Sequence, residues 1–217
     1  MEYEQLRFFE KSDTDKRNEY VANVFRQLGS TNITGADRQK DDFYATEPLA
    51  TVLLCEKEKF SPTVWECCVG QGHIAEVLKQ QGYEVVCSDL IDRGYPETEI
   101  RDFLSAQIVG GGGENKNDII TNPPYKLATQ FVQKAMDISA VGVKVAMFLK
   151  IQFLESQERW ELFKEYPIKT VYVATKRLNC AKDGKFDEFE SSAVCYAWFV
   201  WEKGYKGDTT IKWINNE

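Results

Sequence analysis

Short apolar stretches and amphipathic stretches follow one another along the chain from residue 43 onward. The apolar stretches are rich in β-branched and aromatic residues and are bounded by glycine, proline or an acid, which is typical of buried strands. The amphipathic stretches repeat apolar residues at intervals of three and four, as a helix with one buried side does. Strands are expected at residues 63–68, 84–89, 118–121, 143–149, 168–174 and 193–201, and helices at residues 73–81, 127–138 and 155–166.

The order of these segments predicts the fold class. Because strands alternate with helices, we expect an α/β domain with a mostly parallel sheet and helices on both faces. The last two expected strands have no clear helix between them, which predicts an antiparallel strand at one edge of the sheet. Residues 1–40 are polar, with apolar residues at helical spacing near residues 20–28, so we expect an N-terminal helical arm before a main domain of residues 41–217.

Composition and charge narrow the classes of protein. The chain has 217 residues, of which 43% are hydrophobic and 28% are charged, as in an ordinary globular domain. No apolar run reaches the ~18 residues of a membrane span, and the charged N-terminus lacks a secretory signal, so we expect a cytoplasmic protein. The formal net charge of −7 argues against a non-specific nucleic-acid binder but is compatible with a local basic face.

The six cysteines and the single histidine argue against a metal site. The cysteines form no C-x-x-C pair and His73 is the only histidine in the sequence, so we expect no zinc ligand set. We expect the cysteines to be reduced thiols, as is usual in the cytoplasm.

A glycine-rich turn joins the first expected strand to the first expected helix. In the segment ECCVGQGH, residues 66–73, Gly70 and Gly72 allow a tight turn and a close approach of the backbone to a ligand. Asp89 ends the neighbouring strand, where a carboxylate can bind ribose hydroxyls, and this indicates an adenosine-type cofactor. Glu66 suits a cationic amino group better than a pyrophosphate, which favours S-adenosylmethionine. A dinucleotide site and a plain strand–helix turn are the alternatives.

A second motif, NPPY, follows the strand expected at residues 118–121. The consecutive prolines Pro123 and Pro124 fix the backbone and remove two N–H donors, so the Asn122 side chain and the Pro123 carbonyl can accept hydrogen bonds from an exocyclic amine. Tyr125 offers a flat surface on which a planar base can stack. The motif therefore predicts methylation of a planar amino group, with proximity and orientation as the main sources of rate. A rigid turn that only ends the strand is the alternative.

Over roughly residues 41–205, the chain resembles the S-adenosylmethionine-dependent amino-methyltransferases, most closely the small phage and prophage DNA N6-adenine methyltransferases. The cofactor motif precedes the catalytic motif, as in the gamma class. The resemblance implies a Rossmann-like methyltransferase fold with a seven-stranded sheet. It also implies transfer of a methyl group from S-adenosylmethionine to the exocyclic amine of adenine in DNA, in a bacterial or phage-infected cell.

The same resemblance implies roles for individual residues. The segment DFYATEP, residues 42–48, is similar to a motif that approaches the methionine carboxylate of the cofactor. Asp102 and Phe103 are similar to a pair that contacts the cofactor's adenine. The cofactor-binding residues are then Tyr44, Thr46, Glu66, Gly70, Gly72, Asp89, Asp102 and Phe103, and the catalytic residues are Asn122, Pro123, Pro124 and Tyr125.

Basic residues are frequent in the loop before the last expected strand, and one more, Lys150, follows the strand expected at residues 143–149. Their side chains can hold the phosphates of a nucleic acid, and an aromatic residue in the loop can stack on an extruded base opposite Tyr125. A solvated surface loop is the alternative. The residues expected at nucleic acid are Lys150, Lys176, Arg177, Lys182, Lys185 and Phe186.

The chain departs from the family in one respect. Sequence-specific members usually carry a substantial target-recognition domain, and this chain has no insert large enough for one. We therefore expect short or relaxed site recognition, or recognition supplied by a second subunit or a homodimer. RNA and protein glutamine are alternative substrates, and a non-catalytic cofactor-binding subunit is an alternative role. A nicotinamide dehydrogenase is disfavoured because no proton donor is evident.

Overall fold

The structure is a computed structural model that describes residues 44–105, 114–181, 186 and 194–215. The chain divides into two units, residues 1–38 and residues 39–217, and all described residues belong to the second unit. The predicted N-terminal arm, residues 1–40, lies outside the described residues, so its helical structure stays a prediction.

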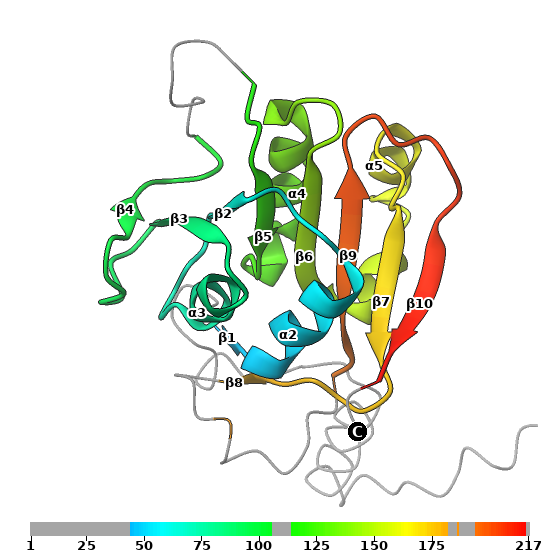
Figure 1. Cartoon of the computed structure of the whole chain (residues 1–217). Helices are drawn as coiled ribbons and strands as arrows, with labels where there is room; N and C mark the ends of the chain where they lie inside the picture. The colour runs from blue at the N-terminus through cyan, green and yellow to red at the C-terminus, as the bar shows by residue number, and fades with distance from the viewer. Residues whose placement is uncertain (1–43, 106–113, 182–185, 187–193, 216–217) are drawn as a thin grey trace, which may run out of the picture. The chain divides into compact units, whose positions relative to one another are not determined.

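A sheet of eight strands runs through the described residues, with helices on both faces (Figure 1). Strand β9 runs antiparallel to its two neighbours, β6 and β7, and all other neighbouring strands are parallel. The mostly parallel α/β fold predicted from the sequence is therefore confirmed. From one edge to the other the strands are β4 (Glu99–Ile100), β3 (Glu84–Asp89), β2 (Thr63–Glu66), β5 (Asp118–Thr121), β6 (Lys144–Lys150), β9 (Tyr196–Glu202), β7 (Thr170–Ala174) and β10 (Thr210–Ile214).

The prediction of an antiparallel strand at an edge was wrong, because β9 lies inside the sheet. It is inserted between β6 and β7, while the two edges are formed by β10 and β4, neither of which was predicted, and the described residues form an eight-stranded sheet rather than the seven-stranded one that the resemblance implied. The burial agrees with this order. Residues 196–201 of β9 are all buried, as in a strand covered on both faces, whereas residues 210–213 of β10 are exposed.

Helices α3 (His73–Gln80) and α4 (Ala128–Ile138) lie close to where the sequence predicts them. Helix α5 (Trp160–Glu165) is shorter than predicted. The chain before it forms the 3-10 helix η4 (Ile151–Leu154), and the Arg159 guanidinium donates hydrogen bonds to carbonyl groups in and just after that turn. No helix among the described residues is both long and apolar enough to cross a membrane.

Helix α2 (Pro48–Lys57) was missed by the sequence analysis. Five of its ten residues are buried, but its apolar residues are not confined to that side, since Leu49 is exposed, so the sequence lacks the spacing of a one-sided amphipathic helix. The buried residues are Ala50, Thr51, Leu53, Leu54 and Cys55.

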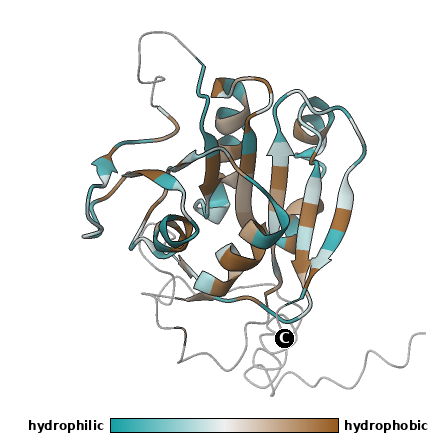
Figure 2. Ribbon diagram, viewed as in Figure 1, coloured by the Kyte–Doolittle hydropathy of each residue, from teal (hydrophilic) through white to brown (hydrophobic). Residues whose placement is uncertain are grey.

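Two hydrophobic cores lie on the two faces of the sheet, and consecutive strand residues alternate between them. Trp65 and Val145 pack with α4 and α5 on one face, while Val64 and Ala146 pack with α2 and α3 on the other. Figure 2 shows hydrophobic residues along the central strands and hydrophilic residues along many of the connecting loops. Because both faces are covered, the central strands are nearly continuous apolar runs.

A second, two-stranded sheet lies apart from the main one. Strand β1 (Ala45–Thr46) pairs antiparallel with β8 (Cys180–Ala181), so that Ala45 lies opposite Ala181 and Thr46 opposite Cys180. The sequence did not predict either strand, because two residues are too few for a periodic pattern. The pair joins two segments that are far apart in the sequence.

Candidate active site

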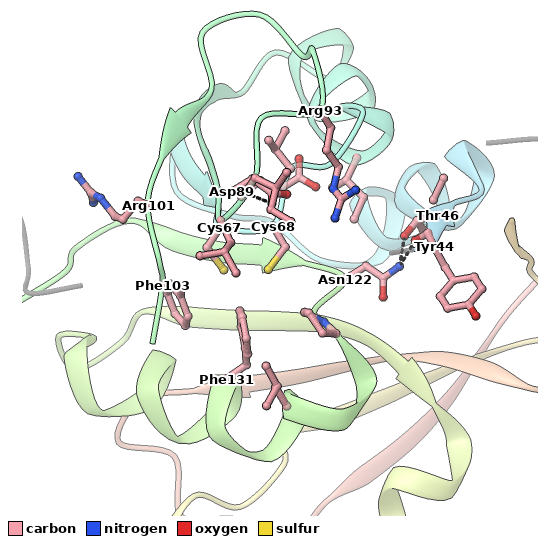
Figure 3. Close-up of a pocket in the computed structure, with 18 of the residues that line it drawn as sticks. Tyr44, Thr46, Cys67, Cys68, Asp89, Arg93, Arg101, Phe103, Asn122 and Phe131 are labelled. Atoms are coloured by element: carbon pink, nitrogen blue, oxygen red, sulfur yellow. Dashed lines mark hydrogen bonds between the residues drawn. The ribbon is translucent and has the colours of Figure 1, made fainter. Parts of the chain in front are cut away.

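A cavity opens at the carboxyl ends of β2, β3 and β5, where ligands lie in open α/β sheets. Its walls include residues 44–46, residues 66–69 at the end of β2, and Asp89 at the end of β3. Residues 101–104 and the NPPY motif complete it, with Asn122, Pro124 and Tyr125 in its lining. The structure thus brings the predicted cofactor motif and the predicted catalytic motif to one cavity (Figure 3).

The glycine turn owes its shape to two residues with positive φ. Gly70 has φ 58° and Gly72 has φ 86°, a left-handed conformation that side chains disfavour. Neither glycine lines the cavity. Asp89 holds the turn, because its Oδ2 accepts the Gly70 N–H at 2.8 Å and its Oδ1 accepts the Ile91 N–H at 3.0 Å. Each carboxylate oxygen has a further lone pair, so Asp89 can still accept ribose hydroxyls.

Tyr95 explains why the second glycine of the turn has no side chain. A Cβ atom on Gly72 would lie 2.1 Å from the Tyr95 ring. The Tyr95 hydroxyl donates to Glu76 at 2.7 Å, which fixes the ring against the start of α3. The turn therefore requires glycine at this position for reasons of both space and backbone conformation.

Glu66 is a buried carboxylate with an unused oxygen. It is 1% exposed, it lines the cavity, and its Oε2 has no hydrogen-bond partner among the described residues. Burial raises the pKa of Glu66 well above its usual value, and the nearby Cys68 and Asp89 raise it further. A buried acid of this kind is stabilised in its charged form by a cationic group. Its position suits the amino group of an amino-acid ligand.

The other end of the cavity has an apolar wall suited to a planar ring. Phe103 is 2% exposed and packs against Phe131 and Trp65, with ring-centroid distances of 5.1 and 5.2 Å. Asp102 is exposed, and its Oδ1 accepts the Leu104 N–H at 3.0 Å, which shapes this part of the wall. The predicted pair of residues 102 and 103 therefore lies where a cofactor ring can pack.

The orientation of the Asn122 amide is fixed by its surroundings. Its Nδ2 donates to the Tyr44 carbonyl and to Thr46 Oγ1, both at 2.9 Å. A carbonyl oxygen can only accept, so the amide nitrogen must face residues 44–46 and Oδ1 must face the other way. Figure 3 shows this arrangement, with the nitrogen turned toward Tyr44 and Thr46 and the oxygen turned away from them. Asn122 therefore presents a hydrogen-bond acceptor at the cavity.

The remaining residues of the NPPY motif occupy different environments. Pro123 is buried and does not line the cavity, whereas Pro124 and Tyr125 do. The Tyr125 ring is half-buried and lies near two other tyrosines, Tyr44 at 6.4 Å and Tyr196 at 5.7 Å between centroids. Burial raises the pKa of the Tyr125 hydroxyl well above its usual value, so the phenol stays neutral.

Tyr44 and Thr46 were predicted at the cofactor. Both line the cavity, but the hydrogen bonds of this segment run to Asn122, and the Tyr44 ring stacks near the Tyr125 ring. Within the described residues, these contacts of Tyr44 and Thr46 hold side chains of the NPPY motif in place. Their binding to a cofactor stays a prediction.

Four of the six residues predicted at nucleic acid are described by the structure, and their role stays a prediction. Lys150 Nζ lies 5.2 Å from the centre of the Tyr125 ring, next to the NPPY motif. Lys176 and Arg177 are exposed just after β7. Phe186 packs edge-on against His73 at 5.5 Å, and among the described rings it is Tyr44 and Tyr196 that lie beside Tyr125. Lys182 and Lys185 lie outside the described residues.

Several residues of the cavity region were not anticipated. Arg93 lies in the loop after β3 and lines the cavity, as does Arg101, whose guanidinium points away from the cavity and pairs with Glu99 (Figure 3). Cys67 and Cys68 also line the cavity, and Cys180 contacts the NPPY motif. Cys67 and Cys68 lie within the ECCVGQGH segment, whereas Arg93, Arg101 and Cys180 belong to no motif of the sequence and are placed there by the fold. All six cysteines are free thiols in the structure, and Cys68, Cys180 and Cys195 are only half-buried.

The described residues contain no group of histidine, cysteine and acidic side chains that could hold a metal ion. No protein-family model and no curated protein matches this chain. Solved structures do match it, and three of them illustrate the likeness.

The first is a proposed class I S-adenosylmethionine-dependent methyltransferase from Listeria monocytogenes, with a TM-score of 0.53 and 11% identity over 94% of this chain and 74% of the other. The second is a proposed RNA methyltransferase from Pyrococcus horikoshii, with a TM-score of 0.52 and 14% identity over 84% of this chain and 98% of the other. The third is the modification subunit of a proposed type I restriction enzyme from Vibrio vulnificus, with a TM-score of 0.53 and 15% identity. The chain has the fold of class I methyltransferases. The match to the third structure covers 92% of this chain and 50% of that subunit.

Proposed function

We propose that this chain is an S-adenosylmethionine-dependent methyltransferase that acts on an amino nitrogen. The proposal depends on one observation above all, that the Asn122 amide is held with its oxygen facing away from residues 44–46, at the cavity that Glu66 and Asp89 also line. A hydrogen-bond acceptor for an amine and two acids suited to the cofactor thus share one space. The methyltransferase fold supports the same conclusion.

The residues of the cavity fit S-adenosylmethionine. Glu66 offers an unpartnered buried oxygen to the amino group of the methionine part, and Asp89 can accept the ribose hydroxyls. Phe103 forms an apolar wall for the adenine ring. The bound cofactor supplies a methyl group made electrophilic by the sulfonium centre.

The chain's own residues orient the acceptor amine. Asn122 Oδ1 accepts one N–H of the amine, and the Pro123 carbonyl is proposed to accept the other. With both hydrogens engaged, the nitrogen lone pair is directed along the remaining axis, toward the cofactor side of the cavity. The amine would need no deprotonation before attack: its nitrogen would gain the methyl group as the methyl–sulfur bond of the cofactor breaks, and the methylated nitrogen would then release one proton to water. Such catalysis operates mainly through positioning.

We further propose that the substrate is adenine in DNA, methylated at N6. Tyr125 offers a flat, neutral ring for a planar base, and the Lys150 ammonium lies over that ring, 5.2 Å from its centre, where a cation can contact a backbone phosphate. Lys176 and Arg177 are proposed to extend this contact. RNA and a protein glutamine share the same reacting group, so they are outcomes that the experiment separates.

The deciding experiment supplies the purified full-length chain with radiolabelled cofactor and unmethylated DNA, RNA or protein in separate reactions. Digestion of the DNA and mass spectrometry of its nucleosides should then identify N6-methyladenine, and methylation-aware sequencing should give the site. Label that enters RNA or protein alone would replace DNA as the substrate. Absence of label in all three, despite binding of S-adenosylhomocysteine, would support a non-catalytic subunit instead.

The two asparagines that flank β5 provide a matched pair of variants. Asn122→Ala removes the acceptor and should lower kcat by roughly 100-fold or more, as loss of a positioned polar group does, while the affinity for S-adenosylhomocysteine stays near the wild-type value. Asn117→Ala, at the opposite end of the same strand, should leave both quantities unchanged. Full activity in Asn122→Ala would rule out the proposed mechanism.

Target recognition is proposed to be relaxed, or to depend on a second subunit or a second copy of the chain. The match to half the length of a modification subunit is compatible with a chain that carries the catalytic part. Gel filtration with and without DNA measures this, because a partner-free monomer that methylates one defined site would contradict the proposal.

A further inference from the structure

We propose that Cys180 is a positioning residue that aligns the two working side chains of the NPPY motif, Asn122 and Tyr125. The proposal rests on the proposed function, because it assigns a role within the same site. No motif in the sequence marks this cysteine, and its place in the fold alone brings it to the catalytic corner.

The pairing of β1 with β8 delivers Cys180 to the site. Thr46 lies directly opposite Cys180 in that pairing, and both residues contact Asn122. The Cys180 sulfur lies 3.7 Å from Asn122 Nδ2 and 3.0 Å from the Tyr125 hydroxyl oxygen. One atom therefore contacts both side chains that are proposed to handle the substrate.

The chemistry of each partner gives the contacts a direction. The Asn122 amide nitrogen is a donor only, so the sulfur accepts from it. Between the sulfur and the Tyr125 oxygen either atom can donate, and both arrangements hold the phenol in place. The polarizable sulfur is large enough to touch both groups at once. The Asn122 amide has two N–H groups, which donate to the Tyr44 carbonyl and Thr46 Oγ1 at 2.9 Å, so the longer contact to Cys180 Sγ at 3.7 Å shares one of these hydrogens.

The buried surroundings of Cys180 disfavour the thiolate. Burial raises the pKa of Cys180 to about 12, and the hydrogen bonds from Tyr125 and Asn122 offset this only in part. The thiol therefore stays protonated at neutral pH and is a poor nucleophile. Its contribution is geometric, and it stays constant across the pH range of ordinary assays.

Two substitutions separate hydrogen bonding from bulk. Cys180→Ser keeps a polar group that can accept from Asn122 and exchange a hydrogen bond with Tyr125. Cys180→Val fills a similar volume without hydrogen bonds. We expect kcat of the serine variant to stay within about threefold of wild type and kcat of the valine variant to fall roughly 10- to 100-fold, the scale of a misplaced reacting group.

Binding and stability measurements distinguish positioning from general damage. The dissociation constant for S-adenosylhomocysteine, measured by calorimetry, and the melting temperature should change little in both variants. Cys195 serves as the control, because it is a half-buried thiol whose sulfur contacts its neighbour's carbonyl, Tyr196 O at 3.9 Å, and neither Asn122 nor Tyr125 is among its hydrogen-bond partners within the described residues. Cys195→Ser and Cys195→Val should both keep wild-type kcat.

The outcomes are distinct. Wild-type kcat in Cys180→Val, or equal losses in the serine and valine variants, would overturn the proposal. If the wild-type chain transfers no methyl group at all, the proposed function fails, and a crystal structure of Cys180→Val decides the positioning claim. An Asn122 amide or Tyr125 ring that has turned from its wild-type orientation supports the claim, and unchanged side chains refute it.

Discussion

The two halves of the cavity are built in different ways. In the cofactor half, the residues that hold one another are close in the sequence, because Asp89 binds the N–H groups of Gly70 and Ile91 and Tyr95 covers Gly72. In the catalytic half, the Asn122 amide is held by Thr46 and Cys180, which are 76 and 58 residues away.

Because of this difference, substitutions in the two halves should change different measured properties. A change in the cofactor half alters a compact turn, so it should appear first in the affinity for the cofactor and in stability. A change in the catalytic half alters the aim of a few polar atoms, so it should appear first in kcat.

The two glycines at the ends of α3 should respond very differently to alanine. Gly72→Ala adds a Cβ that lies 2.1 Å from the Tyr95 ring and also strains a φ of 86°, so we expect a loss of about 2–6 kcal/mol in the free energy of unfolding and weak cofactor binding. Gly82→Ala has a similar φ of 90° but nothing within 4 Å, so it should lose only about 1–2 kcal/mol.

Urea unfolding and calorimetry with S-adenosylhomocysteine measure both variants. Adding Tyr95→Ala to Gly72→Ala should recover part of the lost stability, because it removes the clash but not the backbone strain. If Gly72→Ala and Gly82→Ala lose the same free energy of unfolding, the contact of Tyr95 with the turn does not contribute to stability.

Glu66 should make cofactor binding depend on pH. Its pKa in the folded, cofactor-free protein is raised above the ordinary 4.5, so the folded state keeps the proton to higher pH than the unfolded state does. The stability of the free protein should therefore fall as pH rises above about 4.5 toward the raised pKa. A cationic amino group requires the ionised carboxylate, so affinity for S-adenosylhomocysteine should increase over the same window.

Glu66→Gln should remove this pH dependence and weaken binding by about 1.5–3 kcal/mol at the upper end of the window, since a hydrogen bond to a charged group is lost. Glu84→Gln, an exposed acid at the start of β3 and the far end of the sheet from the cavity, is the control. Calorimetry in buffers of different ionisation enthalpy should detect proton release on binding to the wild type. Equal pH profiles for wild type and Glu66→Gln would contradict the assignment.

Thr46→Val should give the smallest effect. It shows whether Thr46 acts in the catalytic half, through kcat, or in the cofactor half, through cofactor affinity. The variant removes one of the acceptors that hold Asn122, so kcat should fall about fivefold, the value of one hydrogen bond of about 1 kcal/mol. Cofactor affinity should stay unchanged. Weaker binding of the cofactor with an unchanged kcat would instead favour the cofactor-binding role that the sequence predicted for Thr46.

A second threonine gives the control for that experiment. Thr51 is also buried, but its hydroxyl has no hydrogen-bond partner among the described residues. Thr51→Val should therefore leave kcat unchanged and should not reduce stability.

Much of the fold was predictable because the central strands are covered on both faces and are therefore continuous apolar runs. The strands of residues 63–68 and 118–121 were placed correctly within a few positions. The position of β9 was not predictable from its own residues, since a buried run does not reveal its neighbours. Helix α2 and strand β10 were missed because neither follows a simple periodic pattern.

The cavity was predictable to the extent that it depends on short motifs. The glycine turn, Asp89 and the NPPY corner meet as expected, because they follow successive strands of one parallel sheet. The support of Asn122 was not predictable, because Thr46 and Cys180 reach it through a pairing of two residues on each side. Contacts between distant segments leave no trace in local spacing.

Strand β9 has a consequence for the order in which the molecule assembles during synthesis. It fills the place between β6 and β7, both of which leave the ribosome before it, and those two strands have no pairing with each other. The half of the sheet beyond β6 therefore cannot close until the chain has been made past residue 202, whereas β2, β3, β5 and β6 can pair earlier. A nascent chain halted before that point would expose one edge of β6 to solvent and to other chains.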